Sequence, residues 1–215
     1  IIHKAVNKLV KFKEIINFLY REKGNLKYTM NYAPEGVCPD DSYYNVVDDR
    51  DEIDDSGDEI PLINLYTMLV AETNKYTTVE QFTARETDRD RILRDFANGV
   101  TDVLVAMKCL DEGVDVPRAE NAIFCASTGN PRQFIQRRGR ILRIHEDKSM
   151  ANIHDLVVVP YVDYDIESFN MERSLLKREL LRVSDFAKIA TNSSYTENVL
   201  KEIIEYYELN LYEHE

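Results

Sequence analysis

Apolar residues recur along the first twenty positions at gaps of three and four, the period of an amphipathic helix. The members of this stripe are Ile2, Ala5, Leu9, Phe12, Ile16 and Leu19. Gly24 follows the last of them, and glycine is the residue that most often ends a helix. The pattern therefore predicts a helix from the start of the chain to about Gly24. The apolar stretch that comes next predicts a strand over residues 26–33.

Strand-like and helix-like segments then alternate. Pro61 suits the first turn of a helix with Leu62, Leu65 and Leu69 on one face. Thr83 and Glu86 have the spacing of a capping box, which predicts that the next helix opens there and ends near Gly99. Further strands are predicted over residues 76–82, 102–107, 122–126 and 152–159. This alternation is typical of a parallel sheet with helices on both faces, an α/β fold.

Beyond Pro160 the periodicity is helical only. One stripe comprises Phe169, Leu176, Leu180, Val183 and Ala187. Ser194 and Glu197 form a second capping pair, which predicts a helix from there toward Leu211. The sequence thus predicts an α/β domain over residues 1–160 and a C-terminal helical extension over residues 161–215.

The formal net charge of −12 is unevenly distributed. Residues 40–59 contain ten carboxylates and one arginine, a composition that predicts an acidic surface insertion over about residues 37–60. By contrast, five arginines lie within residues 132–143. An otherwise acidic chain therefore has one concentrated positive site, which suits an anionic ligand.

The sequence does not support a membrane protein, a secreted protein or a metal-binding protein. No run approaches the ~18 apolar residues of a membrane span. The three cysteines form no CxxC pair, and the histidines show no metal-ligand spacing beside them. We therefore expect a cytoplasmic protein without a metal site of its own and without a membrane partner.

The sharpest motif is Gln136-Arg-Arg-Gly-Arg-Ile-Leu-Arg143. Arg140 and Arg143 are three apart, so a helix would present both planar guanidinium groups on one face, where they could grip a polyphosphate. An isolated arginine-rich octamer is more often a surface cluster that makes ion pairs. Here, however, every fixed position of a known pattern is present. The segment resembles motif VI of superfamily 2 helicases, in the form found in excision-repair and restriction-type DNA helicases.

A second motif precedes it in the order that this family shows. Residues 103–117 resemble motif V, with Gly113 and Asp115 at the family's fixed places. Asp115 could bind a nucleotide ribose or a motif VI arginine. Met107 stands where the family usually has threonine, so a phosphate contact would fall to the backbone or to Lys108. A Walker B reading of Asp111-Glu112 is rejected, because polar Lys108 and further residues separate it from the apolar run.

Residues 82–99 are similar to the segment between motifs IV and V, with Ala84 in place of the usual glycine. The resemblance makes Thr83 and Arg85 candidates for contacts with a nucleic-acid backbone at a helix N-terminus. An ordinary helix cap is the structural alternative, equally favoured when the segment is taken alone.

Together, the motifs imply the second RecA-like domain of a superfamily 2 motor. In that family ATP and Mg²⁺ are held mainly by an N-terminal RecA-like domain of the same polypeptide. The motif VI arginines Arg140 and Arg143 act as fingers on the nucleotide, with Gln136, Gly113 and Asp115 beside them. DNA is favoured over RNA as the strand, and a nuclease or a repair or restriction protein is a possible further partner. The sequence has no GxxxxGK[ST] loop, so we expect this fragment alone to hydrolyse nothing.

Two other functions compete with the motor. One is a non-catalytic adaptor or regulatory domain that keeps the fold, against which the retained arginines argue. The other is a doubly wound oxidoreductase or transferase, against which the absence of a GxGxxG turn after any strand argues.

Overall fold

The computed structural model describes residues 7–37, 60–107, 116–126, 131–160 and 168–212, without the side chains of residues 131–133. The elements in chain order are α1 (Asn7–Lys23), β1 (Thr29–Tyr32), α2 (Leu62–Thr73), β2 (Val79–Phe82), α3 (Arg89–Ala97), β3 (Val103–Ala106), β4 (Asn121–Phe124), α4 (Pro131–Ile141), β5 (Asn152–Asp155), α5 (Phe169–Ala187) and α6 (Ser193–Tyr206). The chain divides into two compact units. One contains residues 1–127 and 136–156, the other residues 128–135 and 157–215, and each is described by itself.

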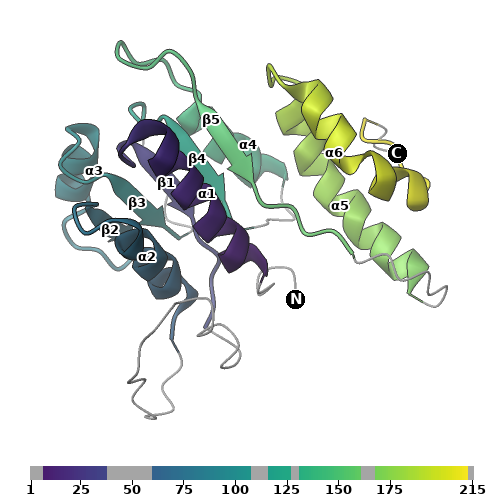
Figure 1. The fold of residues 1–215 in the computed structure, drawn as a ribbon, viewed down its shortest axis with the longest axis horizontal. Coiled ribbons are helices and arrows are strands. Elements are labelled where there is room, and N and C mark those ends of the chain that lie inside the picture. The colour runs from purple at the N-terminus through teal and green to yellow at the C-terminus, as the bar shows by residue number, and fades with distance from the viewer. Residues whose placement is uncertain (1–6, 38–59, 108–115, 127–130, 161–167, 213–215) are drawn as a thin grey trace. The chain divides into compact units, whose positions relative to one another are not determined.

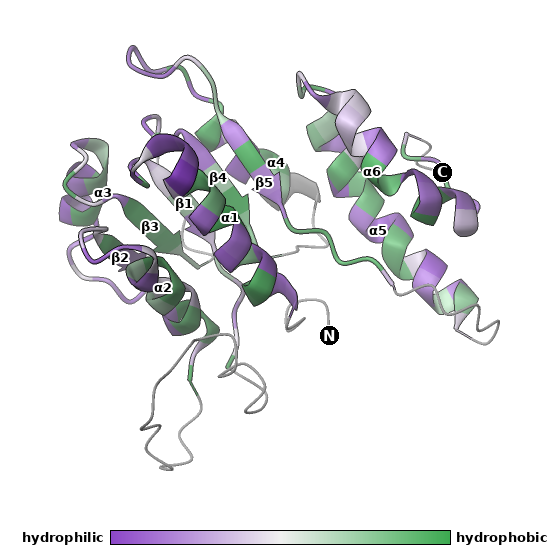
Figure 2. Cartoon of the chain, viewed as in Figure 1, coloured by the Kyte–Doolittle hydropathy of each residue, from purple (hydrophilic) through white to green (hydrophobic). Residues whose placement is uncertain are grey.

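The first unit is built on a five-stranded sheet in the order β2-β3-β1-β4-β5, with every pairing parallel (Figure 1). Strands β1, β3 and β4 are buried along their whole length, and the continuous apolar run of β3 is typical of such a strand. In Figure 2 β3 is green, whereas the helices show both green and purple residues. The expected α/β fold with a parallel sheet is confirmed.

The direction of each crossover places the helices. The connection through α2 runs from the central strand to the β2 edge, whereas those through α3 and α4 run in the opposite direction across the sheet. Because such crossovers are right-handed, α2 lies on one face while α3 and α4 lie on the other. Arg137 of α4 lies over the ring of Tyr32, and Phe96 of α3 contacts Tyr28, which agrees with that placement. Both faces of the sheet are therefore covered.

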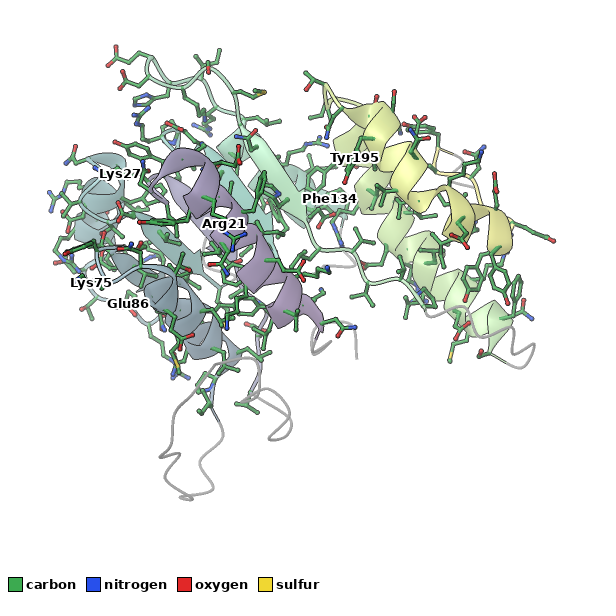
Figure 3. All side chains as sticks on the ribbon, in the orientation of Figure 1. Arg21, Lys27, Lys75, Glu86, Phe134 and Tyr195 are labelled. Carbon is green, nitrogen blue, oxygen red and sulfur yellow. The ribbon has the colours of Figure 1, made fainter. Side chains whose placement is uncertain are left out.

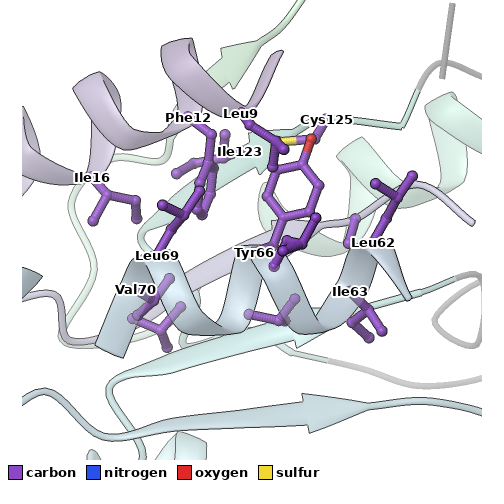
Figure 4. Close-up of a cluster of buried hydrophobic side chains, with 14 of the residues drawn as sticks. Leu9, Phe12, Ile16, Leu62, Ile63, Tyr66, Leu69, Val70, Ile123 and Cys125 are labelled. Carbon is purple, nitrogen blue, oxygen red and sulfur yellow. The ribbon is translucent and has the colours of Figure 1, made fainter. Parts of the chain in front are cut away.

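The largest described core lies between α1, α2 and one face of the sheet (Figure 4). Phe12 packs edge-on against Tyr66, with ring centroids 4.8 Å apart. The predicted stripes of both helices are buried here, namely Leu9, Phe12, Ile16, Leu19, Leu62, Leu65 and Leu69. Lys8, however, is also buried, and its ammonium donates to the Cys125 carbonyl oxygen at 2.9 Å. Burial raises the pKa of the Cys125 thiol well above its usual range, which marks it as a core group.

Each strand is shorter than its apolar run, and the backbone explains two of the differences. Tyr28 has a φ of 58°, so the extended conformation of β1 begins only at Thr29 and not at Leu26. Strand β5 pairs with β4 alone, and β4 ends at Phe124, opposite Asp155. The Leu156 N–H still donates to the Phe124 carbonyl oxygen at 3.0 Å, but residues 157–159 lie outside the strand although they are more apolar than residues 152–155.

The second unit contains α5 and α6, which pack through Leu176, Leu180, Val183 and Leu200. The predicted stripe on α5 is confirmed. The capping prediction for the last helix is wrong, because α6 begins at Ser193 after Asn192, and Ser194 lies inside it. Tyr195 donates its backbone N–H to the Asn192 carbonyl oxygen instead. The helix ends at Tyr206, and Arg173 of α5 donates to the Tyr207 and Glu208 carbonyl oxygens just beyond that end.

The acidic segment of residues 38–59 lies outside the described residues. No helix in the described ranges is long and apolar enough to cross a membrane. In the same ranges, no group of three or more His, Cys, Asp and Glu side chains could hold a metal ion.

Candidate functional site

The carboxyl ends of β2 and β3 bring two of the sequence motifs together. Phe82 and Ala106 are register partners, and the Met107 N–H donates to the Phe82 carbonyl oxygen at 3.2 Å. Thr83 and Met107 are therefore neighbours at the carboxyl edge of the sheet, the edge at which open α/β sheets bind ligands. Lys108, the cation predicted to act there, lies outside the described residues.

Thr83 forms a turn and not a helix cap. Its hydroxyl accepts the Arg85 backbone N–H at 3.3 Å and lies 3.5 Å from the carboxylate of Glu86, a residue labelled in Figure 3. Helix α3 begins only at Arg89, after Asp88. The capping-box prediction is therefore wrong, because a threonine hydroxyl can bond an N–H two residues on without opening a helix. Arg85 is exposed on this turn, ahead of the helix N-terminus where we expected it.

Arg89 lies at the same edge and was missed by the sequence reasoning. It is the first residue of α3, and its guanidinium carbon is 4.8 Å from the centre of the Phe82 ring. A cation at a helix N-terminus is opposed by the helix dipole, so helix formation alone does not favour arginine there. The sequence analysis did not show this conflict, because it predicted that the helix opens at Thr83 and Glu86. Thr83, Arg85 and Arg89 thus place two cations and a hydroxyl near the end of one edge strand.

Helix α4 contains the motif VI residues and ends among them. Arg137 is buried over Tyr32, with its guanidinium carbon 5.5 Å from the ring centre. Gln136 is exposed, and Arg140 is half-buried. The helix ends at Ile141, so Arg143 lies beyond it and is exposed. The prediction that Arg140 and Arg143 share one helix face is therefore wrong, because only Arg140 is helical.

Gly139 stands beside Arg140 on an open side of the helix. A Cβ atom built there would meet no described atom within 4 Å, apart from the helix's own backbone. Glycine in a helix interior is destabilising by roughly 0.5–1 kcal/mol relative to alanine. Packing against the described residues of the first unit therefore does not explain this glycine.

The end of α4 lies near the amino ends of the strands. Lys148 donates to the Ile141 carbonyl oxygen at 2.8 Å and to the Pro117 carbonyl oxygen at 2.7 Å. Pro117 belongs to the segment that leads into β4, and in Figure 1 the loop between α4 and β5 lies at the end of the sheet where these strands begin. Motif VI thus ends beside the last residues of motif V. Gly113 and Asp115, the motif V residues predicted to bind nucleotide, lie outside the described residues.

The candidate residues therefore separate into two sets. Thr83, Arg85 and Arg89 lie at the carboxyl edge, and Arg140 and Arg143 lie at the amino edge. Arg85 and Arg143 are exposed, and Arg89 and Arg140 are half-buried.

A match to a known protein family falls on the part of the chain that contains these motifs. Residues 63–145 match the family described as helicase conserved C-terminal domain. This part of the chain therefore resembles the C-terminal domain of helicases.

Two curated relatives match part of the chain. The DNA 3'-5' translocase XPB2 of Sulfurisphaera tokodaii is 46% identical over 77 residues, which are 36% of this chain and 17% of that protein. The putative ATP-dependent helicase IRC3 of Saccharomyces cerevisiae is 34% identical over 73 residues, 34% of this chain and 11% of that protein. The matches thus span less than a fifth of either relative's length.

Solved structures agree on the fold. The crystal structure of T4 UvsW matches with a TM-score of 0.52 and 15% identity, over 87% of this chain and 33% of that one. Domain 2 of the DEAD-box helicase Mss116p, bound to an RNA duplex, matches with a TM-score of 0.50 and 13% identity, over 96% of this chain and 77% of that one. At such identities the likeness establishes the RecA-like architecture alone.

Proposed function

We propose that this chain is the second motor domain of an ATP-dependent DNA helicase or translocase. It supplies Arg140 and Arg143 as arginine fingers and contributes part of the strand-binding surface. The observation that carries the proposal is the position of these two arginines. They lie at the end of α4 and on the residues just after it, outside the core and beside the end of motif V.

The amino-edge residues suit a polyphosphate. Arg140 and Arg143 offer planar forks of N–H donors that match phosphate oxygens in pairs. Gly139 leaves open space next to Arg140, so a ligand or a second domain can approach the helix backbone closely. Gln136 is exposed one turn before Arg140 and adds a neutral amide. We place Gly113 and Asp115 of motif V in the same nucleotide site.

The carboxyl-edge residues suit a nucleic-acid backbone. Thr83 provides a hydroxyl and Arg85 an exposed cation, and Lys108 adds a third group after β3. Contacts of this kind bind phosphate and sugar and do not distinguish between bases, which fits a protein that moves along a strand. Arg89, next to them, increases the positive charge of the surface.

ATP and Mg²⁺ are held mainly by an N-terminal RecA-like domain of the same polypeptide, with this chain closing on the nucleotide from the opposite side. The sequence of this chain has no phosphate-binding GxxxxGK[ST] loop, so it hydrolyses no ATP alone. Bound ATP supplies the phosphoryl group that is transferred to water. Arg140 and Arg143 stabilise the charge that develops on it, a contribution of about 10³- to 10⁵-fold in rate for arginine fingers.

Nucleotide state controls movement through the same residues. Arg140 and Arg143 bind the triphosphate form more strongly than its products, so they bias closure of the two domains. The strand-binding residues at the other edge are carried along by the same rigid sheet, and each cycle thus shifts the grip on the strand. DNA is favoured because the relative XPB2 is described as a DNA translocase. A repair, restriction or nuclease protein is the further partner that we propose.

Steady-state ATPase of the full-length protein tests this function. With saturating DNA, Arg143→Ala is expected to lower kcat by about 10³-fold or more, because charge in the transition state loses its bidentate partner. Arg21→Ala is the matched control, since Arg21 is an exposed arginine on α1, labelled in Figure 3. Near-normal turnover in a folded Arg143→Ala protein would defeat the motor proposal and leave the adaptor function.

A further inference from the structure

Lys148 lies at the junction of two motifs without belonging to either. Its ammonium donates to three backbone carbonyl oxygens, those of Pro117 at 2.7 Å, Ile141 at 2.8 Å and Ala119 at 3.2 Å. Pro117 is the last residue of motif V and Ala119 lies just after it, whereas Ile141 is the last residue of α4 and lies between Arg140 and Arg143. One half-buried cation therefore joins the ends of both motifs.

The bond to Ile141 fixes where the helix stops. The last carbonyl groups of a helix have no partner inside it, and a cation there also complements the negative end of the dipole. The Leu142 N–H still bonds to the Arg138 carbonyl oxygen, and Arg143 then leaves the helix. Lys148 thus holds the backbone between the two proposed fingers at the point where its direction changes.

A tight turn delivers Lys148 to this place. The Lys148 N–H donates to the His145 carbonyl oxygen at 3.0 Å, and the two residues form an isolated antiparallel bridge. The Asp147 N–H donates to the His145 ring nitrogen Nδ1 at 3.2 Å. We call residues 145–148 the clasp. The hydrogen bonds within the clasp already restrict its backbone. Less conformational entropy is therefore lost when Lys148 binds the three carbonyl groups.

A second contact ties the clasp to the same segment. The Asp147 carboxylate is 3.8 Å from Arg118, and Arg118 also lies 3.6 Å from the carboxylate of Glu120. The Arg118 guanidinium carbon stacks 4.0 Å from the ring centre of Tyr28, just before β1. Since Arg118 is mostly buried, this ion pair and stack hold the segment to the sheet. The clasp is therefore anchored to a fixed support.

We propose that Lys148 is a positioning residue for Arg140 and Arg143, and that this role rests on the function proposed above. By joining Ile141 to Pro117 and Ala119, it fixes the distance between the finger arginines and the nucleotide end of motif V. Catalytic groups must be held closely, and a misplacement of about 1 Å can cost on the order of 10²-fold in rate.

Kinetics of the full-length protein test the role of Lys148. At saturating DNA, Lys148→Met is expected to lower kcat about 10- to 100-fold, with less than about a threefold change in KM for ATP. The second variant is Lys148→Gln, which keeps two N–H donors and is expected to lose less. Lys201→Met is the matched control, because Lys201 is an exposed lysine of α6 paired with Glu205. A folded Lys148→Gln protein with wild-type kcat would overturn the inference, even if Lys148→Met does not fold.

An Arg140→Lys background separates positioning from general destabilisation. If Lys148 acts through the guanidinium fork of Arg140, Lys148→Met should reduce kcat much less in that background than in the wild type. An equal fold-reduction in both backgrounds would overturn the inference. If Arg143→Ala loses kcat and Lys148→Met does not, the positioning role of Lys148 is refuted and the proposed function is not. Unchanged kcat in Arg143→Ala would refute the proposed function itself.

Discussion

The two edges of the sheet offer different groups. The carboxyl edge offers a turn with a hydroxyl and an exposed arginine, Thr83 and Arg85, on the connection after the outermost strand. The amino edge offers the end of a helix whose backbone is fixed by Lys148. A turn tolerates small shifts of a strand that slides past, whereas transfer of a phosphoryl group requires fixed donors. The difference suits two ligands, a nucleic-acid backbone at the first edge and a nucleotide at the second.

The motif V segment connects these edges. Met107 lies beside Thr83 at the carboxyl edge, and Pro117 and Ala119 lie beside Ile141 at the amino edge. A strand bound at one edge and a nucleotide bound at the other would thus contact opposite ends of one short segment. Coupling between two sites requires a physical element that both can bias, and we propose this segment for that role.

Among variants that keep the charge of the side chain, a large effect is expected from replacing a finger arginine by lysine. Arg140→Lys preserves one positive charge but removes the planar fork, so kcat of the full-length protein should fall about 10²- to 10³-fold. Affinity for DNA in the absence of nucleotide should stay within about twofold, because the carboxyl edge is unchanged. A loss of DNA affinity as large as the loss of kcat would contradict the assignment of DNA and nucleotide to different edges of the sheet.

A moderate effect is expected at the other edge. Arg85→Ala removes one cation next to the strand, so DNA affinity should fall about fivefold, equivalent to about 1 kcal/mol. The slope of log K against log salt should decrease in magnitude by about one, while kcat at saturating DNA is unchanged. Fluorescence anisotropy over a salt series measures both quantities. Arg94→Ala, an exposed arginine further along α3, is the control that should leave the slope unaltered.

The smallest effect is expected from Gly139→Ala, which tests whether another group approaches α4 at the amino edge. Gly139→Ala adds a methyl group where no described atom lies within 4 Å, so thermal unfolding of this chain should show a gain of about 0.5–1 kcal/mol. In the full-length protein the same methyl group meets whatever approaches α4, and kcat should fall. A variant that is both more stable and fully active would show that nothing closes on this side of the helix.

Much of the fold followed from periodicity. The stripes of α1, α2 and α5 and the buried strands β3 and β4 were predicted from the sequence, because a helix or a central strand shows its burial in its own residues. The ends of the helices and strands were predicted less accurately. The Thr83 and Glu86 spacing fits both a capped helix and a turn, and only the observed start of α3 at Arg89 distinguishes them.

The candidate site was also predicted only in part. The motifs indicated which residue types matter, and the structure brings Thr83 next to Met107 as the parallel order requires. The exit of Arg143 from α4 was not foreseen, because it coincides with a bond from Lys148, seven residues after Ile141. Contacts of that kind depend on the clasp and on the distant Pro117, and no local pattern in the sequence records them.

Paired measurements on Arg85→Ala and Arg143→Ala test most directly whether the two edges serve different ligands. DNA affinity without nucleotide and kcat at saturating DNA would be measured for each variant of the full-length protein. We expect Arg85→Ala to weaken DNA binding and keep kcat, and Arg143→Ala to abolish turnover and keep DNA binding. If both variants changed the same quantity, the assignment of DNA to the carboxyl edge and ATP to the amino edge would be wrong.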